Sequence, residues 1–176
     1  MTDSKVLKVE FYIFDFTNPN DENPPCRPEP TSKNDFPDFG VIFENNEDFL
    51  GKIIISYDGV NTYFNDNIYG LVRNMCFRSI KKLILKEEVK LMYFTTHGYI
   101  NLIPNGNEID IMGDHFESIK LPYKDFIRAI FDSGKRFTTL FERTGTKTEE
   151  NINLINLLKE DEKAALVELE KAYNKT

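Results

Sequence analysis

Apolar and polar residues alternate at the start of the chain, and the period changes further along. In residues 5–16 the side chains of Leu7, Val9, Phe11 and Ile13 share one parity, which predicts a strand with one apolar face. The segment FGVIFENNEDFLGKIIISYDG predicts two more strands, about residues 39–45 and 51–57, joined by a turn at Asn45-Asn46. A proline-rich excursion, residues 19–38, lies between the first predicted strand and the second.

Helical spacing replaces this alternation at residues 65–88. Asn65 or Asp66 can cap the start of the helix, and basic residues gather in its C-terminal half, where the helix dipole favours cations. Residues 89–114 then predict three strands in a meander, with hairpin turns at His97-Gly98 and Asn105-Gly106. A short extended segment, ESIKLPY, follows the meander.

Two helices are predicted in the last third of the chain. Residues 123–145 begin after Pro122, place Phe and Ile side chains on one face, contain a predicted break at Ser133-Gly134 and end at Gly145. A last helix, with a predicted interruption near Glu160–Asp161, carries a stripe at helical spacing: Ile155, Leu158, Glu162, Ala165, Leu169 and Tyr173. This stripe favours docking on the domain, and a seam with a partner helix is the alternative.

Strands grouped in hairpins with helices between them predict an α+β fold. We expect a mostly antiparallel sheet of about six strands with helices packed on one face. Residues 1–145 would form a single domain that includes the excursion, and residues 146–176 a C-terminal helix packed on it. A chain of 176 residues with 15 Phe and 8 Tyr is large and apolar enough to form a sizeable core.

Charge limits the classes of function. The net charge is −7, and residues 1–66 carry −8 while residues 67–147 carry +4. Such a chain lacks the basic footprint of a nucleic-acid-binding or polybasic membrane-surface protein, so we expect no direct nucleic-acid contact and no membrane. The start of the chain has no apolar signal-peptide core and no window approaches 18 apolar residues. We therefore expect a cytoplasmic protein in which Cys26 and Cys76 are free.

The sequence contains no recognisable motif for catalysis or cofactor binding. No serine lies in a G-x-S-x-G turn, and FLGKIII lacks the upstream glycine and the hydroxyl residue of a phosphate-binding loop. His115 lies near Asp110, Asp114 and Glu117, a composition that suits a divalent cation, but alternation along a strand would scatter these side chains over both faces. We predict no catalytic residue, no cofactor and no metal ligand.

Acidic residues are densest between positions 21 and 48. Only Arg27 and Lys33 oppose eight acids in this stretch: Asp21, Glu22, Glu29, Asp35, Asp38, Glu44, Glu47 and Asp48. A solvated acidic loop is one interpretation. The other is a surface that captures a basic partner, because carboxylates steer the association of positively charged proteins. These eight residues are the candidate partner-binding residues.

The middle of the chain, about residues 39–143, resembles the immunity proteins of bacterial polymorphic-toxin and contact-dependent growth-inhibition systems. The resemblance is one of element order. The strand pair quoted above is followed by a helix ending in LVRNMCFRSIKKLILKEE, the meander VKLMYFTTHGYINLIPNGNEIDIMGD, and a strand leading into the helix of IKLPYKDFIRAIFDSGKRFTTLFER. The resemblance implies a small acidic α+β protein that binds one cognate toxin domain, blocks its active site and has no activity of its own. The excursion and the last helix lie outside it.

Three functions are open at this point. The first is an immunity protein that neutralises a basic toxin domain, for example a nuclease, with the proline-stiffened excursion at the toxin-facing rim. The second is a regulatory or scaffold protein that oligomerises through its C-terminal helix. The third is a metal-dependent hydrolase that uses the cluster around His115.

Overall fold

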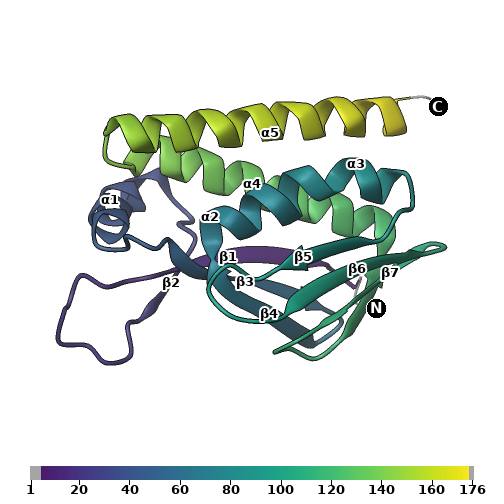
Figure 1. The fold of residues 1–176 in the computed structure, drawn as a ribbon, viewed down its shortest axis with the longest axis horizontal. Helices are drawn as coiled ribbons and strands as arrows, with labels where there is room; N and C mark the ends of the chain where they lie inside the picture. The colour runs from purple at the N-terminus through teal and green to yellow at the C-terminus, as the bar shows by residue number, and fades with distance from the viewer. Residues whose placement is uncertain (1–4, 175–176) are drawn as a thin grey trace.

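A computed structural model describes residues 5–174, in which the helices gather on one side of two antiparallel sheets (Figure 1). The predicted α+β class is confirmed, but the single sheet of about six strands is wrong, because the strands form two sheets of four. The first has the order β2-β1-β3-β4 and the second β5-β6-β7-β8. Their strands are β1 (Lys8–Phe14), β2 (Cys26–Pro28), β3 (Leu50–Tyr57), β4 (Val60–Asn67), β5 (Val89–Met92), β6 (Tyr99–Asn105), β7 (Glu108–Gly113) and β8 (Ile119–Pro122).

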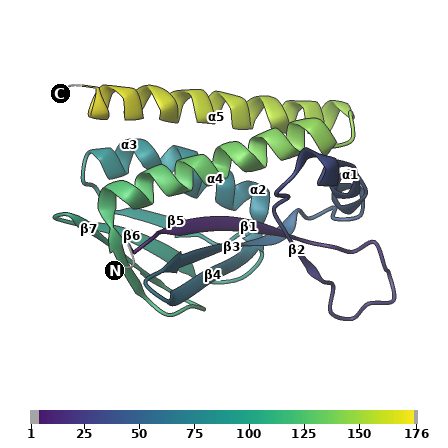
Figure 2. The same ribbon diagram turned by 180° about the vertical axis from the view of Figure 1, so that it is seen from behind.

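The helices form two layers above the sheets (Figure 2). They are the 3₁₀ turn η1 (Lys33–Asp35), α1 (Phe36–Glu44), α2 (Ile68–Leu71), the π-helix η2 (Val72–Arg78), α3 (Ser79–Ile84), α4 (Tyr123–Thr144) and α5 (Glu149–Tyr173). Helix α4 packs on β1, β7 and β8 and also on η2, while α5 lies outside it and contacts α3, η2 and α4. The buried side chains of α5 are Ile155, Leu158, Ala165 and Leu169, which belong to the predicted stripe. The division into a domain of residues 1–145 and a C-terminal helix stays a prediction.

The strand β4 carries polar side chains on its buried face. The sequence did not predict this strand. Its buried positions alternate, but two of the three are polar: Thr62 and Asp66, with Phe64 between them. Asp66 accepts hydrogen bonds from the backbone N–H groups of Phe94 and Thr95, at 2.7 and 2.8 Å. The loop between β5 and β6 is therefore joined to the buried face of β4. The predicted helix begins at Ile68 rather than at residue 65, and its cap is Asn67 rather than Asn65 or Asp66.

The predicted strand at residues 39–45 is wrong, because this segment lies in helix α1. Pro37 occupies the first turn of that helix, where its missing N–H costs nothing. The buried side chains Phe39, Ile42 and Phe43 follow helical spacing and contact the core. Phe43 packs its ring 5.2 Å from that of Phe141 on α4, centroid to centroid.

Most other predicted elements are confirmed. Val9, Phe11 and Ile13 form the buried face of β1, and the three strands of the meander are β5, β6 and β7. The predicted breaks at Ser133-Gly134 and near Glu160–Asp161 are wrong, since α4 and α5 are continuous. A Cβ on Gly134 would lie 2.7 Å from Cβ of Cys76, so this glycine permits close packing of α4 on η2.

The π-helix η2 binds α5 through two arginines. The Nε atoms of Arg73 and Arg78 both donate to Oδ2 of Asp161, at 2.6 and 3.0 Å. Residues five apart point about 140° away from each other around an α-helix, which turns about 100° per residue. In a π-helix the i→i+5 hydrogen bonds place them nearly one above the other. The π geometry therefore lets both guanidinium groups reach one carboxylate.

Candidate functional site

The charge of the molecule is concentrated at one end. Residues 15–48 contain nine acids and two bases, so their formal charge equals the −7 of the whole chain, and the remaining 142 residues contain 20 acids and 20 bases. In both views the loop after β1 and helix α1 lie together at the end of the molecule opposite the C-terminus (Figures 1 and 2). We call this part of the surface, residues 15–48, the acidic end.

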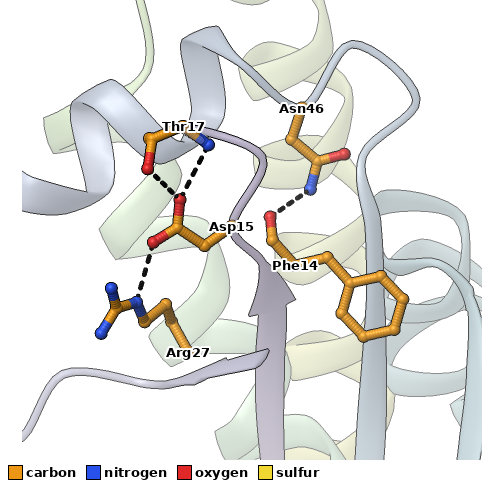
Figure 3. A network of polar contacts seen from close by, with 5 residues as sticks. All are labelled: Phe14, Asp15, Thr17, Arg27 and Asn46. Carbon is orange, nitrogen blue, oxygen red and sulfur yellow. Dashed lines mark hydrogen bonds and ion pairs between the residues drawn. The ribbon is translucent and has the colours of Figure 1, made fainter. Parts of the chain in front are cut away.

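A buried carboxylate organises the acidic end (Figure 3). Asp15 follows β1 and is only 4% exposed. Its Oδ1 accepts hydrogen bonds from N–H and Oγ1 of Thr17, at 3.0 and 2.6 Å, and Nε of Arg27 donates to its Oδ2 at 2.8 Å. These contacts join the start of the loop to β2, at the point where the chain returns to pair with β1.

The protonation of Asp15 follows from the same contacts. Burial by itself would raise the pKa of this carboxyl, but the hydrogen bonds from Thr17 and Arg27 and the charge of Arg27 together outweigh it, so the pKa lies below its ordinary value. Asp15 is therefore an anion near neutral pH, held in place by its partners.

Asn46 fixes the other side of the acidic end. Its side chain is 2% exposed, and its Nδ2 donates to the backbone oxygens of Phe14 and Leu50, at 3.1 and 2.8 Å. Its Oδ1 accepts from the N–H of Leu50 at 2.8 Å. One amide thus joins the segment after α1 to the end of β1 and to the start of β3.

A hollow of about 550 Å³ lies between the excursion and α1. Its polar lining includes Asp15 and Arg27 together with Glu29, Asp35 and Asp38, and its apolar lining includes Pro30, Phe39 and Ile42. Its walls thus combine carboxylates with hydrophobic surface, which is the environment that a long cationic side chain fits, because its stem is apolar and its head is charged. We call it the Asp15 hollow.

The eight predicted partner-binding residues occupy three places on the acidic end. Glu29, Asp35 and Asp38 line the Asp15 hollow. Asp21 and Glu22 are exposed in the loop between β1 and β2, whereas Glu44, Glu47 and Asp48 are exposed at the end of α1 and just after it. The structure therefore brings three of the eight into one concave site and leaves five at its margins.

An ion pair distant in sequence holds the excursion against α4. Nε of Arg136 donates to Oε2 of Glu29 at 2.5 Å, and its Nη2 donates to the backbone oxygen of Val9 at 2.8 Å. Nothing in the sequence indicates this pair, because its members are 107 residues apart. The role of Asp15 was equally hidden, although an Asp-Phe-Thr sequence at the end of a strand is typical of a side chain that accepts hydrogen bonds from a following turn.

The cluster around His115 is not gathered into a site. Oδ1 of Asp110 lies 3.3 Å from Nζ of Lys120, Oδ2 of Asp114 accepts from the N–H of Tyr99, and Nε2 of His115 lies 2.7 Å from the backbone oxygen of His97. Within residues 5–174 no group of three or more His, Cys, Asp or Glu side chains is arranged to hold a metal ion. Cys26 and Cys76 are both free, and burial raises the pKa of Cys76 to about 12.

Comparison with protein-family models, with curated proteins and with solved structures finds no match. None of the helices in the described part of the chain combines the length and the hydropathy needed to cross a membrane. The cytoplasmic location expected from the sequence stays a prediction.

Proposed function

We propose that this protein is an immunity-type binding protein, which neutralises a cognate toxin domain by covering its active site with the acidic end. The observation that carries the proposal is the distribution of charge: residues 15–48 carry −7, and the rest of the chain is neutral. A basic active site, such as that of a nuclease, would be attracted to this one end, because opposite charges increase the rate of productive encounter.

The Asp15 hollow supports this proposal at the level of single side chains. An arginine or lysine of the toxin would place its aliphatic stem along Pro30 and Phe39 and its charged head toward Asp35 and Asp38. Arg27 and Arg136 keep Asp15 and Glu29 in fixed positions, so little side-chain entropy would be lost when the partner binds.

Oligomerisation through α5 is the less favoured alternative. The apolar stripe that would form the seam is already buried within the chain at Ile155, Leu158, Ala165 and Leu169. A partner helix on this stripe would have to displace α3 and α4, which α5 already contacts.

The proposal is tested by co-expressing the protein with the toxin domain encoded by the neighbouring gene. We expect the cells to survive, and we expect the two proteins to copurify as a complex in which the toxin is inactive. Cells that die with the protein present, or a neighbouring gene that encodes no toxin domain, would contradict the proposal.

A further inference from the structure

A second hollow, with the opposite charge, lies at the free edge of the second sheet. It has a volume of about 460 Å³ and separates β5 from the helical segment of η2 and α3. Arg78, Lys82 and Lys90 contribute to its lining, and none of its described lining residues is acidic. We call it the β5 groove.

The backbone of β5 faces this groove with unpaired positions. In the second sheet β5 has β6 as its one neighbour, so its other side is a sheet edge. The N–H of Tyr93 donates to the backbone oxygen of Gly98 and therefore points toward the β6 side. Because successive residues of a strand point their backbone groups to opposite sides, Lys90 and Met92 point theirs toward the groove. An added strand could make up to about four backbone hydrogen bonds with these two residues.

Hydrophobic side chains are exposed beside the same edge. Met92 is 63% exposed and Phe94 is 58% exposed. Both contribute to the lining of the groove. An exposed edge strand next to large apolar side chains is the arrangement to which extended peptides bind, with the backbone giving affinity and the flanking side chains giving selectivity.

We infer that the β5 groove binds an extended, acidic segment of a partner protein, which adds to the second sheet as a strand beside β5. The acidic character follows mainly from Lys82 and Lys90, because the charge of Arg78 is already paired with Asp161. A second copy of this protein paired β5 to β5 fits less well, because the same basic side chains of both copies would then lie against each other. This inference concerns a surface separate from the acidic end and does not depend on the proposed toxin.

The test uses a blocked hexapeptide that alternates glutamate and valine, added to the full-length protein. We expect the amide resonances of Lys90 and Met92 to shift most in nuclear magnetic resonance spectra. Two control peptides are matched to the first: one carries lysine in place of each glutamate, and the other is N-methylated on every residue. Neither control should bind, because the first reverses the charge and the second removes the hydrogen-bond donors.

Variants of the protein separate the contribution of backbone hydrogen bonds to peptide binding from that of the basic side chains. Met92→Pro removes one N–H that faces the groove, a change that edge strands tolerate, and should abolish the shift at Lys90. Lys82→Glu should weaken binding by about fivefold or more, whereas the matched variant Lys163→Glu, an exposed lysine on α5, should not change it. If Met92→Pro does not fold, the N-methylated peptide tests on the wild-type protein whether binding requires backbone hydrogen bonds.

Three results would overturn the inference. They are the absence of any shift at millimolar peptide, equal binding of the lysine peptide, and shifts confined to other parts of the molecule. A dimer that buries β5 in the absence of peptide, detected by light scattering and by protection of the Met92 amide, would assign the edge to a second copy instead. The double variant Asp35→Lys and Asp38→Lys should bind the peptide normally, so failure of the proposed function and failure of this inference are distinguishable.

Discussion

Asp15 shows how one side chain can set the shape of a surface. The residue is almost fully buried and joins the loop after β1 to Arg27 on β2. Both members of this pair line the Asp15 hollow. The consequence can be measured as stability and as its dependence on pH.

The variant Asp15→Asn should lower the free energy of unfolding near neutral pH by about 1–3 kcal/mol, because Arg27 and Thr17 lose a charged acceptor. The folded-state pKa of Asp15 is lower than its ordinary value of 3.8, so the ionised form adds stability above that pH. The contribution disappears as the pH falls through the lowered pKa. Urea denaturation at several pH values should therefore show that the free energies of unfolding of wild type and variant become more similar below about pH 4.

The control for this experiment is Asp21→Asn, in the exposed part of the same loop. It should leave both the stability and its pH dependence nearly unchanged. If the free energies of unfolding of wild type and Asp15→Asn differed by the same amount from neutral to acidic pH, the charge of Asp15 would not contribute to stability.

Gly134 should resist a substitution that normally stabilises helices. Alanine in place of glycine favours an exposed helix by about 1 kcal/mol. A Cβ at this position, however, would lie 2.7 Å from Cβ of Cys76 and 2.8 Å from the ring of Phe77. We expect Gly134→Ala to lower the free energy of unfolding by about 1–3 kcal/mol in chemical denaturation. The exposed Thr139→Ala on the same helix is the control, and a Gly134→Ala variant as stable as wild type would show that α4 can move away from η2.

At the scale of elements, one carboxylate on α5, that of Asp161, contacts two arginines of η2. Asp161→Ala leaves Arg73, whose side chain is only 21% exposed, without the carboxylate that it contacts. We expect a loss of about 1–3 kcal/mol in the free energy of unfolding, and faster hydrogen exchange in α5 than in β1 or β3. The neighbouring exposed residue offers a control, Glu160→Ala. Equal exchange rates in the two variants would mean that the apolar stripe alone holds the helix.

The elements that could be predicted from the sequence are those whose buried side is mainly apolar. The buried side of β1 is entirely apolar, and that of α4 is formed mostly by Phe, Ile and Leu side chains, with Ser133 and Thr138 as the buried polar exceptions. β4 does not, since Thr62 and Asp66 occupy buried positions and obtain their partners from loops more than 25 residues away. Helix α1 was predicted as a strand because a short apolar run is consistent with both structures. In the candidate site, the acidity was visible in the sequence, whereas Asp15 with Arg27 and Arg136 with Glu29 depend on how the chain folds back.

At the scale of the whole molecule, the uneven charge predicts the kinetics of partner binding. The double variant Asp35→Lys and Asp38→Lys reverses charge beside the Asp15 hollow. For a basic partner we expect the association rate constant to fall by about tenfold or more at low ionic strength, with a smaller effect at high salt. Stopped-flow or biosensor measurements at two salt concentrations would show this.

A matched double variant shows whether the association rate depends on where the charge is changed or only on the net charge of the protein. Glu87→Lys and Glu88→Lys change the charge by the same amount, in the exposed segment between α3 and β5 at the other end of the molecule (Figure 1). Their effect on the association rate constant should be small. If both double variants slowed association equally, total charge rather than the acidic end would govern the encounter.

The concentration of negative charge in residues 15–48 makes the molecule an electric dipole, because the rest of the chain has no net formal charge. A positively charged chromatography resin would therefore adsorb it in one orientation, with residues 15–48 against the matrix and the C-terminal end of α5 away from it (Figure 1). Bound in this way, the protein would have its proposed toxin-binding surface blocked, and the resin and the toxin would compete for it. Elution at rising salt would then rank variants of the acidic end in the same order as their affinity for a basic partner.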